Sequence, residues 1–169
     1  YAPSPEFAGS LAKPELLPDG YDGSPISSFN MRVNLRAEVR GTGALPDHLV
    51  RNSEYLHALY REEVAFFDQQ LGRLLAAVAA TGRPTIIAFT ADHGEEFYEH
   101  GGWWHGLSLY DEQIAIPLMI KLPNSEVTEV NTDLARHVDI APTVATLVGL
   151  PLAEQWQGKS LISESLDLQ

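Results

Sequence analysis

The sequence predicts an α/β domain, and three features of its hydrophobic pattern support this prediction. A long segment after Pro46 carries apolar residues at alternating spacings of three and four, which is typical of an amphipathic helix. Two short apolar runs follow, at 85–90 and 117–122. A helix that leads into a buried strand is a unit of α/β proteins. The chain has 169 residues, of which 44% are hydrophobic, so it can bury a sizeable core.

The first 45 residues are expected to form an irregular surface segment. They are rich in Pro, Gly and Ser up to about Ile26, a composition that does not sustain a helix. The alternation of Met31, Val33 and Leu35 allows one short strand in an exposed or edge position.

The long helix is predicted from Asp47 to about Thr81, where Gly82 and Pro84 supply the stop. Its apolar stripe predicts that it packs on a sheet. The stripe consists of Leu56, Tyr60, Val64, Phe67, Leu71, Leu74 and Val78. The run 85–90 follows without any alternation, which predicts a parallel strand covered on both faces.

The rest of the chain is predicted to contain a loop, a strand and a helix. Residues 91–106 include four glycines and show no useful periodicity, so a structured loop is expected there. The run 117–122 is a second strand. Asp139 is a candidate cap for a helix that runs to Val148, with Gly149 at its end.

Charge and composition exclude several functions. Eleven Lys and Arg against 23 Asp and Glu give a net charge of -12, which repels nucleic acids and anionic membrane surfaces. We therefore expect no nucleic-acid partner and no membrane contact from this chain. The absence of Cys excludes disulfides, thiolate zinc sites and cysteine nucleophiles. Arg61, Glu62 and Glu63 are expected on a solvated helix face.

Asp92 and His93 are the candidate metal ligands. They directly follow the strand 85–90, and ligand sites in α/β sheets lie beyond the C-terminal ends of strands. A carboxylate and an imidazole offer a hard oxygen and a borderline nitrogen, and Gly94 lets the backbone turn so that both can converge. The same three residue types also suit a simple turn at a strand end, so both interpretations stay open. Two ligands do not close a cation site. Further candidates within twenty residues are Glu95, Glu96, Glu99, His100, His105, Asp111 and Glu112.

His105 is the candidate catalytic residue. The segment 100–106 combines two His, three Gly and two Trp in a loop that must return to the same strand end. A His in such surroundings can bind an anionic oxygen or donate a proton. Trp103 and Trp104 can equally be core anchors, with the histidines as satisfied polar groups.

Taken together, these stretches resemble a known family. They are similar to the second metal-binding motif of the sulfatase family, in the alkaline phosphatase-like superfamily. The stretches are FTADHGEE (89–96), EHG (99–101), HGLSLYDE (105–112) and IPLMI (116–120). Two further segments resemble helices of that family, YREEVAFFDQQLGRLL (60–75) and VDIAPTVATLVGL (138–150). The resemblance runs from about Tyr55 to Leu161.

The resemblance implies a fold and an activity. The fold is a three-layer α/β/α sandwich of the alkaline phosphatase-like type, formed by one domain, 1–169, that lacks its N-terminal portion. Residues 1–45 are the irregular segment of this domain and 46–169 its α/β portion. The activity is that of a metal-dependent sulfuric ester hydrolase, a sulfatase. Asp92 and His93 would bind its divalent cation, usually calcium, and His105 would contact the sulfate where the family has Lys or His.

Other parts of the family's site are absent from this sequence. Family members also have a paired Asp, and a Cys or Ser in a C/S-x-P-x-R motif or a Thr or Ser in phosphotransferase relatives. This chain has no Cys and no Ser in that pattern. We therefore expect it to contribute half of the metal site and to be inactive alone. His93 stands where many sulfatases have Asn, and its nitrogen leaves manganese or zinc open beside calcium.

Several alternatives remain beside a sulfatase. The substrate is expected to be a sulfate or phosphate ester. A phosphodiesterase, phosphonate monoester hydrolase or phosphoethanolamine transferase of the same superfamily is one alternative, and a non-enzymatic metal-binding domain is another. If central strands are missing, exposed strand edges predict self-association.

Overall fold

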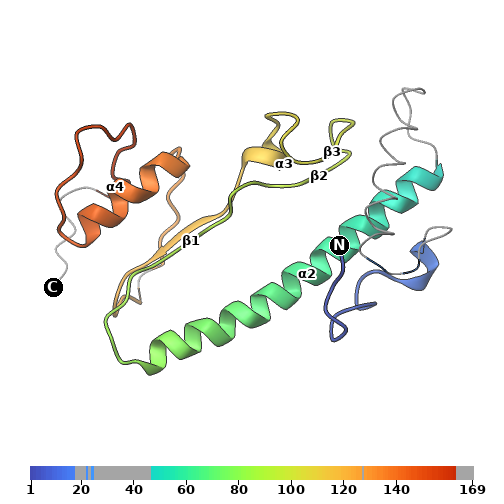
Figure 1. Ribbon diagram of the computed structural model, residues 1–169, viewed down its shortest axis with the longest axis horizontal. Coiled ribbons are helices and arrows are strands. Elements are labelled where there is room, and N and C mark those ends of the chain that lie inside the picture. The colour runs from blue at the N-terminus through green and yellow to red at the C-terminus, as the bar shows by residue number, and fades with distance from the viewer. Residues whose placement is uncertain (18–21, 23, 25–46, 127, 163–169) are drawn as a thin grey trace. The chain divides into compact units, whose positions relative to one another are not determined.

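The computed structural model describes residues 1–17, 22, 24, 47–126 and 128–162. The chain divides into two compact units, Tyr1–Asn124 and Ser125–Gln169. In chain order the elements are η1 (Pro14–Leu16), α2 (Asp47–Ala80), β1 (Ile87–Thr90), β2 (Glu96–Phe97), β3 (Trp103–Trp104), α3 (Asp111–Ile114), β4 (Leu118–Lys121) and α4 (His137–Leu147) (Figure 1). The single-domain boundary stays a prediction, and the strand expected around 31–35 lies outside the described residues.

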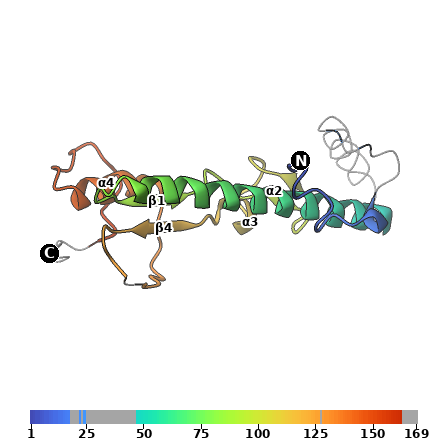
Figure 2. The same cartoon turned by 90° about the horizontal axis from the view of Figure 1, so that it is seen from below.

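The predicted long helix is confirmed. α2 is one unbroken helix of 34 residues that begins at Asp47 and ends at Ala80 (Figure 2). Gly82 follows at a φ of 65°, a conformation that glycine adopts without steric cost, and the chain then leaves the helix axis. Within the described parts of the chain, no helix combines the length and apolar character that crossing a bilayer requires.

The core of the first unit surrounds the N-terminal half of α2. Its buried members are Ala12, Tyr55, Leu56, Leu59 and Trp103. Trp103 is 1% exposed, so its interpretation as a core anchor is confirmed, and Trp104 packs partly buried against the same cluster.

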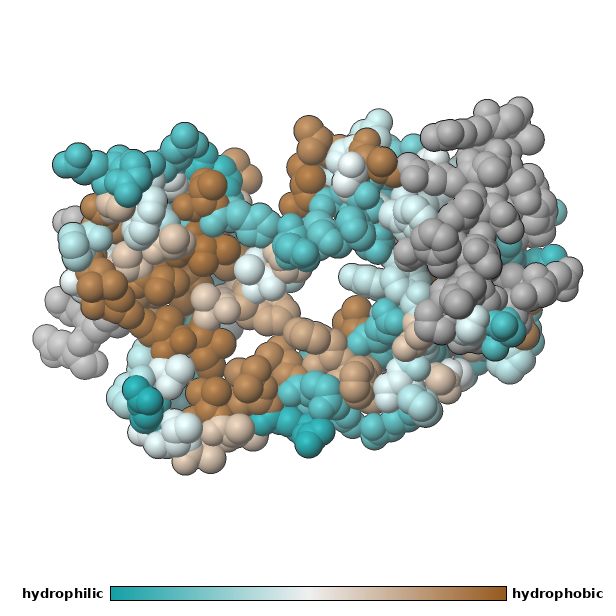
Figure 3. Space-filling view, in the orientation of Figure 1, coloured by the Kyte–Doolittle hydropathy of each residue, from teal (hydrophilic) through white to brown (hydrophobic). Residues whose placement is uncertain are grey.

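The C-terminal half of α2 is not covered. Val64, Phe67 and Leu74 belong to the predicted stripe but are exposed, Phe67 by 52%. The ring of Phe67 lies 6.2 Å from that of Phe89 in β1. Hydrophobic surface runs along this half of the helix and over β1 and β4 in Figure 3. Leu56 is thus the buried member of the stripe, and Tyr55 and Leu59, which share the core with it, lie outside the stripe. The stripe therefore predicts the helix and overstates its burial.

β1 pairs with β4, and the pairing is antiparallel. The register sets Phe89 opposite Met119 and Thr90 opposite Leu118. None of these strand residues is buried, and exposure alternates along each strand. The prediction of a parallel strand covered on both faces is thus wrong for the described residues. An apolar run indicates side chains on both faces that favour burial, but it does not encode the direction of the neighbouring strand.

Residues 96–104 form a hairpin where the sequence predicts a loop. Glu96 of β2 lies opposite Trp104 of β3, and Phe97 lies opposite Trp103. Strands of two residues are too short to show a period of two, so the pattern could not reveal them.

A buried carboxylate holds the N-terminal segment against α2. Glu62 is fully buried, and its Oε1 accepts the backbone N–H groups of Leu11 at 2.7 Å and Ala12 at 2.9 Å. The expectation of a solvated Glu62 is wrong, because a helix pattern does not show which irregular segment lies on a face. Residues 1–17 are otherwise irregular, as predicted, with only the short η1.

α4 begins two residues before the predicted cap. Arg136 is the N-cap, and Asp139 is the third helical residue. The Asp139 carboxylate accepts the Arg136 backbone N–H at 3.0 Å and two guanidinium donors at 3.1 and 2.9 Å. Lys159 donates its backbone N–H to the same carboxylate at 2.9 Å, so Asp139 joins the helix to the segment that follows it. Asp139 therefore acts in the first turn, but not as the N-cap.

We expect Glu62→Ala to destabilise the first unit. The substitution leaves two backbone N–H groups of residues 11 and 12 without their acceptor. The expected loss is about 2 kcal/mol of unfolding free energy, measured by urea titration. Glu63→Ala is the matched control, because Glu63 accepts an exposed N–H, that of Ala2. Equal losses in the two variants would show that the buried carboxylate has no special role.

Asp139 predicts an acid-sensitive component of stability in the second unit. Hydrogen bonds from Arg136 and Lys159 lower the pKa of Asp139 from 3.8 to about 2. The folded chain binds a proton at Asp139 less readily than the unfolded chain does. The contribution of this carboxylate to the free energy of unfolding is therefore complete above about pH 4 and is lost as the pH falls toward 2. Urea unfolding across this range should show a steeper acid decline for wild type than for Asp139→Asn. Parallel curves would contradict the assignment.

Candidate active site

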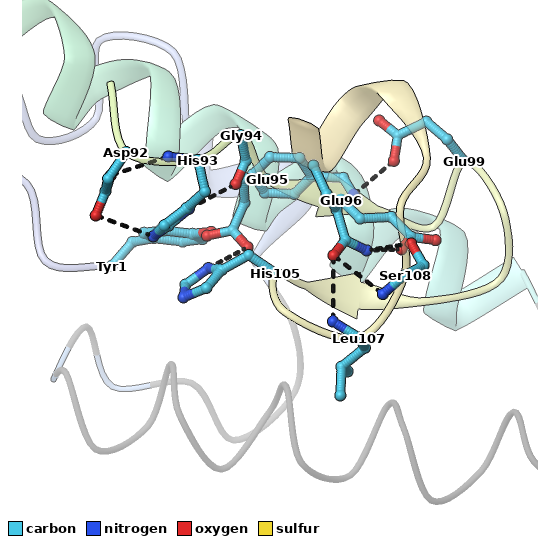
Figure 4. A network of polar contacts seen from close by, with 12 residues as sticks. Tyr1, Asp92, His93, Gly94, Glu95, Glu96, Glu99, His105, Leu107 and Ser108 are labelled. Carbon is cyan, nitrogen blue, oxygen red and sulfur yellow. Dashed lines mark hydrogen bonds and ion pairs between the residues drawn. The ribbon is translucent and has the colours of Figure 1, made fainter. Parts of the chain in front are cut away.

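Asp92 and His93 lie directly after β1, and their side chains face each other (Figure 4). Asp92 Oδ1 accepts the backbone N–H of His93 at 3.1 Å. His93 Nδ1 lies 2.8 Å from the carbonyl oxygen of Gly94. Because a carbonyl only accepts, Nδ1 carries a hydrogen in this contact, and Nε2 is the ring nitrogen left outside it. Nε2 in turn lies 3.6 Å from Asp92 Oδ2.

The pair fits two ligands of a divalent cation. A carboxylate oxygen and the unprotonated Nε2 of a neutral imidazole are both cation ligands, and two atoms each about 2.0–2.5 Å from one ion can lie this far apart. The Asp92 side chain is 89% exposed, so an ion can reach it. Over the ranges that the structure describes, no three potential ligands gather in one place. These residues therefore offer two donor atoms and not a closed site.

His105 lies against His93, and so the segment 100–106 returns to the end of β1 as predicted. The two rings stack with centroids 3.6 Å apart and planes inclined by 24°. His105 Nδ1 lies 3.3 Å from Glu95 Oε1, while Tyr1 donates its hydroxyl to Glu95 Oε2 at 2.8 Å (Figure 4). The site thus joins residues from both ends of the first unit.

His100 belongs to a different contact. Its Nδ1 lies 2.6 Å from Glu112 Oε1, and its ring stacks on Tyr110 with centroids 3.7 Å apart. Burial acts to raise the pKa of Glu112, but hydrogen bonds and attraction from His100 lower it on balance. Of the two histidines in the segment 100–106, only His105 therefore joins His93.

Glu96 fixes the shape of the loop that carries His105. Its buried carboxylate accepts the backbone N–H groups of Gly102 at 2.7 Å and His100 at 3.2 Å. Gln113 donates its side-chain amide to the other oxygen at 2.6 Å. Glu96 was a candidate metal ligand by sequence, and the structure gives its oxygens to the loop instead.

Gln113 extends this network, and the sequence contains no signal for its role. Its side-chain oxygen accepts the backbone N–H groups of Leu107 at 3.3 Å and Ser108 at 3.4 Å. Its carbonyl oxygen accepts the N–H of Gly94 at 2.8 Å. One buried residue thus connects the start of the loop, next to His93, to its end.

Gly102→Ala tests this network. A Cβ at Gly102 would lie 2.6 and 2.8 Å from the two Glu96 carboxylate oxygens, so the carboxylate must move. We expect a loss of about 1–3 kcal/mol of unfolding free energy, measured by urea titration. Gly72→Ala, within α2 and with nothing inside 4 Å, is the matched control and should gain about 1 kcal/mol. A Gly102→Ala variant as stable as wild type would contradict the account.

Comparison with known proteins finds one family. A family model described as Sulfatase matches residues 18–150. An uncharacterized sulfatase of Escherichia coli, YidJ, is 31% identical over 121 residues, which cover 71% of this chain and 24% of the relative. Arylsulfatase K is 30% identical over 129 residues in Bos taurus, covering 75% of this chain and 23% of the relative. In Danio rerio it is 33% identical over 124 residues, covering 72% and 23%. The chain spans about a quarter of the length of these relatives.

Proposed function

Because this chain belongs to the sulfatase family, we propose that it is part of a metal-dependent sulfuric ester hydrolase. In this proposal Asp92 and His93 are two of the metal ligands, and His105 contacts the sulfate group. The observation that carries it is the 3.6 Å approach of Asp92 Oδ2 to His93 Nε2. The ring of His105 stacks on that of His93, so it would be close to an anion held at this site.

Each of the three side chains has a distinct task. Asp92 and His93 bind through Oδ2 and Nε2, the two atoms that their own hydrogen bonds leave available. When bound, a divalent cation supplies Lewis-acid chemistry that polarises the ester oxygens. His105 has its Nδ1 directed to Glu95, so its Nε2 is the atom that faces an anionic oxygen, and it donates there when the ring carries both hydrogens. Such local donors matter because a net charge of -12 repels an anionic ester.

The metal is proposed to be calcium, as in the resemblance drawn from the sequence. The imidazole nitrogen of His93 instead favours manganese or zinc, which accept nitrogen ligands more readily. The same residue supports a second candidate activity, hydrolysis of phosphodiesters or phosphonates on the same scaffold.

The remaining parts of the site are proposed to come from outside this chain. The family matched here implies an alkaline phosphatase-like α/β fold. We propose that β1 and β4 belong to the larger sheet of a three-layer α/β/α sandwich, since both faces of this pair carry apolar side chains that are not buried. Without that cover, the isolated chain should self-associate and be inactive.

The proposal is tested on the complete protein with an aryl sulfate as substrate. We expect Asp92→Asn, His93→Ala and His105→Ala each to lower kcat/KM by about 100-fold or more, and the 169-residue chain alone to show no turnover. Asp68→Asn on the exposed face of α2 is the control and should behave as wild type.

Calorimetric titration with calcium, manganese and zinc identifies the ion, and Asp92→Asn should weaken its binding. Turnover of phosphodiesters or phosphonates without sulfate esters would favour the second candidate. Wild-type kinetics in the Asp92 variant would overturn the metal site.

A further inference from the structure

We propose that Glu95 is a positioning residue that holds the imidazole of His105 in one orientation, with Tyr1 holding Glu95 in turn. This inference rests on the proposed function, in which His105 contacts the sulfate. The geometry behind it is a chain of two hydrogen bonds, from Tyr1 Oη to Glu95 Oε2 at 2.8 Å and between Glu95 Oε1 and His105 Nδ1 at 3.3 Å.

The contact fixes which nitrogen of His105 faces the substrate. A carboxylate accepts hydrogen bonds and does not donate them, so His105 Nδ1 carries a hydrogen. One ring face is covered by His93 at 3.6 Å, and one nitrogen is held by Glu95. A partly exposed imidazole would otherwise turn about its side-chain torsions. With both contacts in place, Nε2 is the atom left for a ligand.

Glu95 is not available as a metal ligand. Its side chain is only 10% exposed, and each of its two oxygens already has a donor. It also does not form part of any group of three possible ligands in the part of the chain that the structure describes. Glu95 therefore acts on His105 and does not bind the metal ion in this proposal.

The position of Tyr1 is set by α2 and β2. Its ring packs edge-on against Tyr60, with centroids 5.6 Å apart, and against Phe97 at 6.0 Å. The hydroxyl is thereby presented to a carboxylate 94 positions later in the chain. The orientation of His105 therefore depends on the N-terminal segment that Glu62 holds against the same helix.

A role of Glu95 through its charge and a role through its hydrogen bond predict opposite changes in sulfate binding when the residue is replaced by Ala. This difference provides the test. If the carboxylate acted only by its charge, Glu95→Ala would remove a repulsive anion and tighten sulfate binding. If it positions His105, Glu95→Ala should weaken binding of inorganic sulfate and lower kcat/KM for an aryl sulfate by about tenfold. Glu95→Gln has no charge but keeps an acceptor for Nδ1, so it should retain most of both.

The experiment uses the metal-loaded complete protein, with sulfate binding measured by calorimetry and metal content measured for each variant. Glu95→Ala combined with His105→Ala should be no worse than His105→Ala alone, because Glu95 acts through that ring. Tyr1→Phe should give a smaller loss in the same direction. Asp68→Ala, which removes an exposed acid of α2, is the matched control and should bind sulfate as wild type.

The inference is overturned if the two losses multiply in the double variant, or if Glu95→Ala binds sulfate as tightly as wild type or more tightly. It is also overturned if Glu95→Gln loses as much as Glu95→Ala. A His105→Ala variant with wild-type activity would instead refute the proposed role of His105, so the two failures are distinguishable.

Discussion

The shape of the chain segment that connects β1 to β4 depends on one buried group, the carboxylate of Glu96. The hairpin that contains it has strands of only two residues, so a backbone ladder cannot fix the loop. Glu96 instead collects two backbone N–H groups and the Gln113 amide. A carboxylate removed from water is costly unless it is hydrogen-bonded, so these donors are constrained to remain where they are. The position of His105 relative to His93 is a consequence of that constraint.

The same device recurs in both units. Glu62, Glu96 and Asp139 are buried, and each accepts backbone N–H groups from a segment outside its own element. These backbone N–H groups belong to irregular segments, so no neighbouring strand supplies their acceptor. The buried carboxylate takes that role. Acidic residues thus tie irregular chain to regular elements in a protein whose strands are very short. Some of the Asp and Glu residues that give this chain its negative charge are therefore buried and stabilise the fold, and do not lie on the surface.

Local patterns predicted what is local in this fold. The apolar spacing from Leu56 onward was enough to predict the helix α2. The two neighbouring positions after β1 were enough to predict that Asp92 and His93 lie close together. Tertiary choices were not predictable in the same way. The antiparallel partner of β1 depends on β4, and burial of Glu62 depends on a segment 50 positions away. Gln113 was missed because an amide has no periodicity or charge that would mark it as buried.

The hydrogen bonds of the loop also explain why only one of its acids faces His93. Four glutamates of the loop each accept a hydrogen bond from a group other than His93. Glu95 is bonded by Tyr1, Glu96 by the loop backbone, Glu99 by the N–H of Phe97 and Glu112 by His100. Asp92 is the acid whose Oδ2 lies 3.6 Å from His93 Nε2, close enough for an ion pair with a protonated ring. In this exposed position water can also separate the two atoms, so the pair offers a carboxylate oxygen and an imidazole nitrogen to a ligand without requiring one.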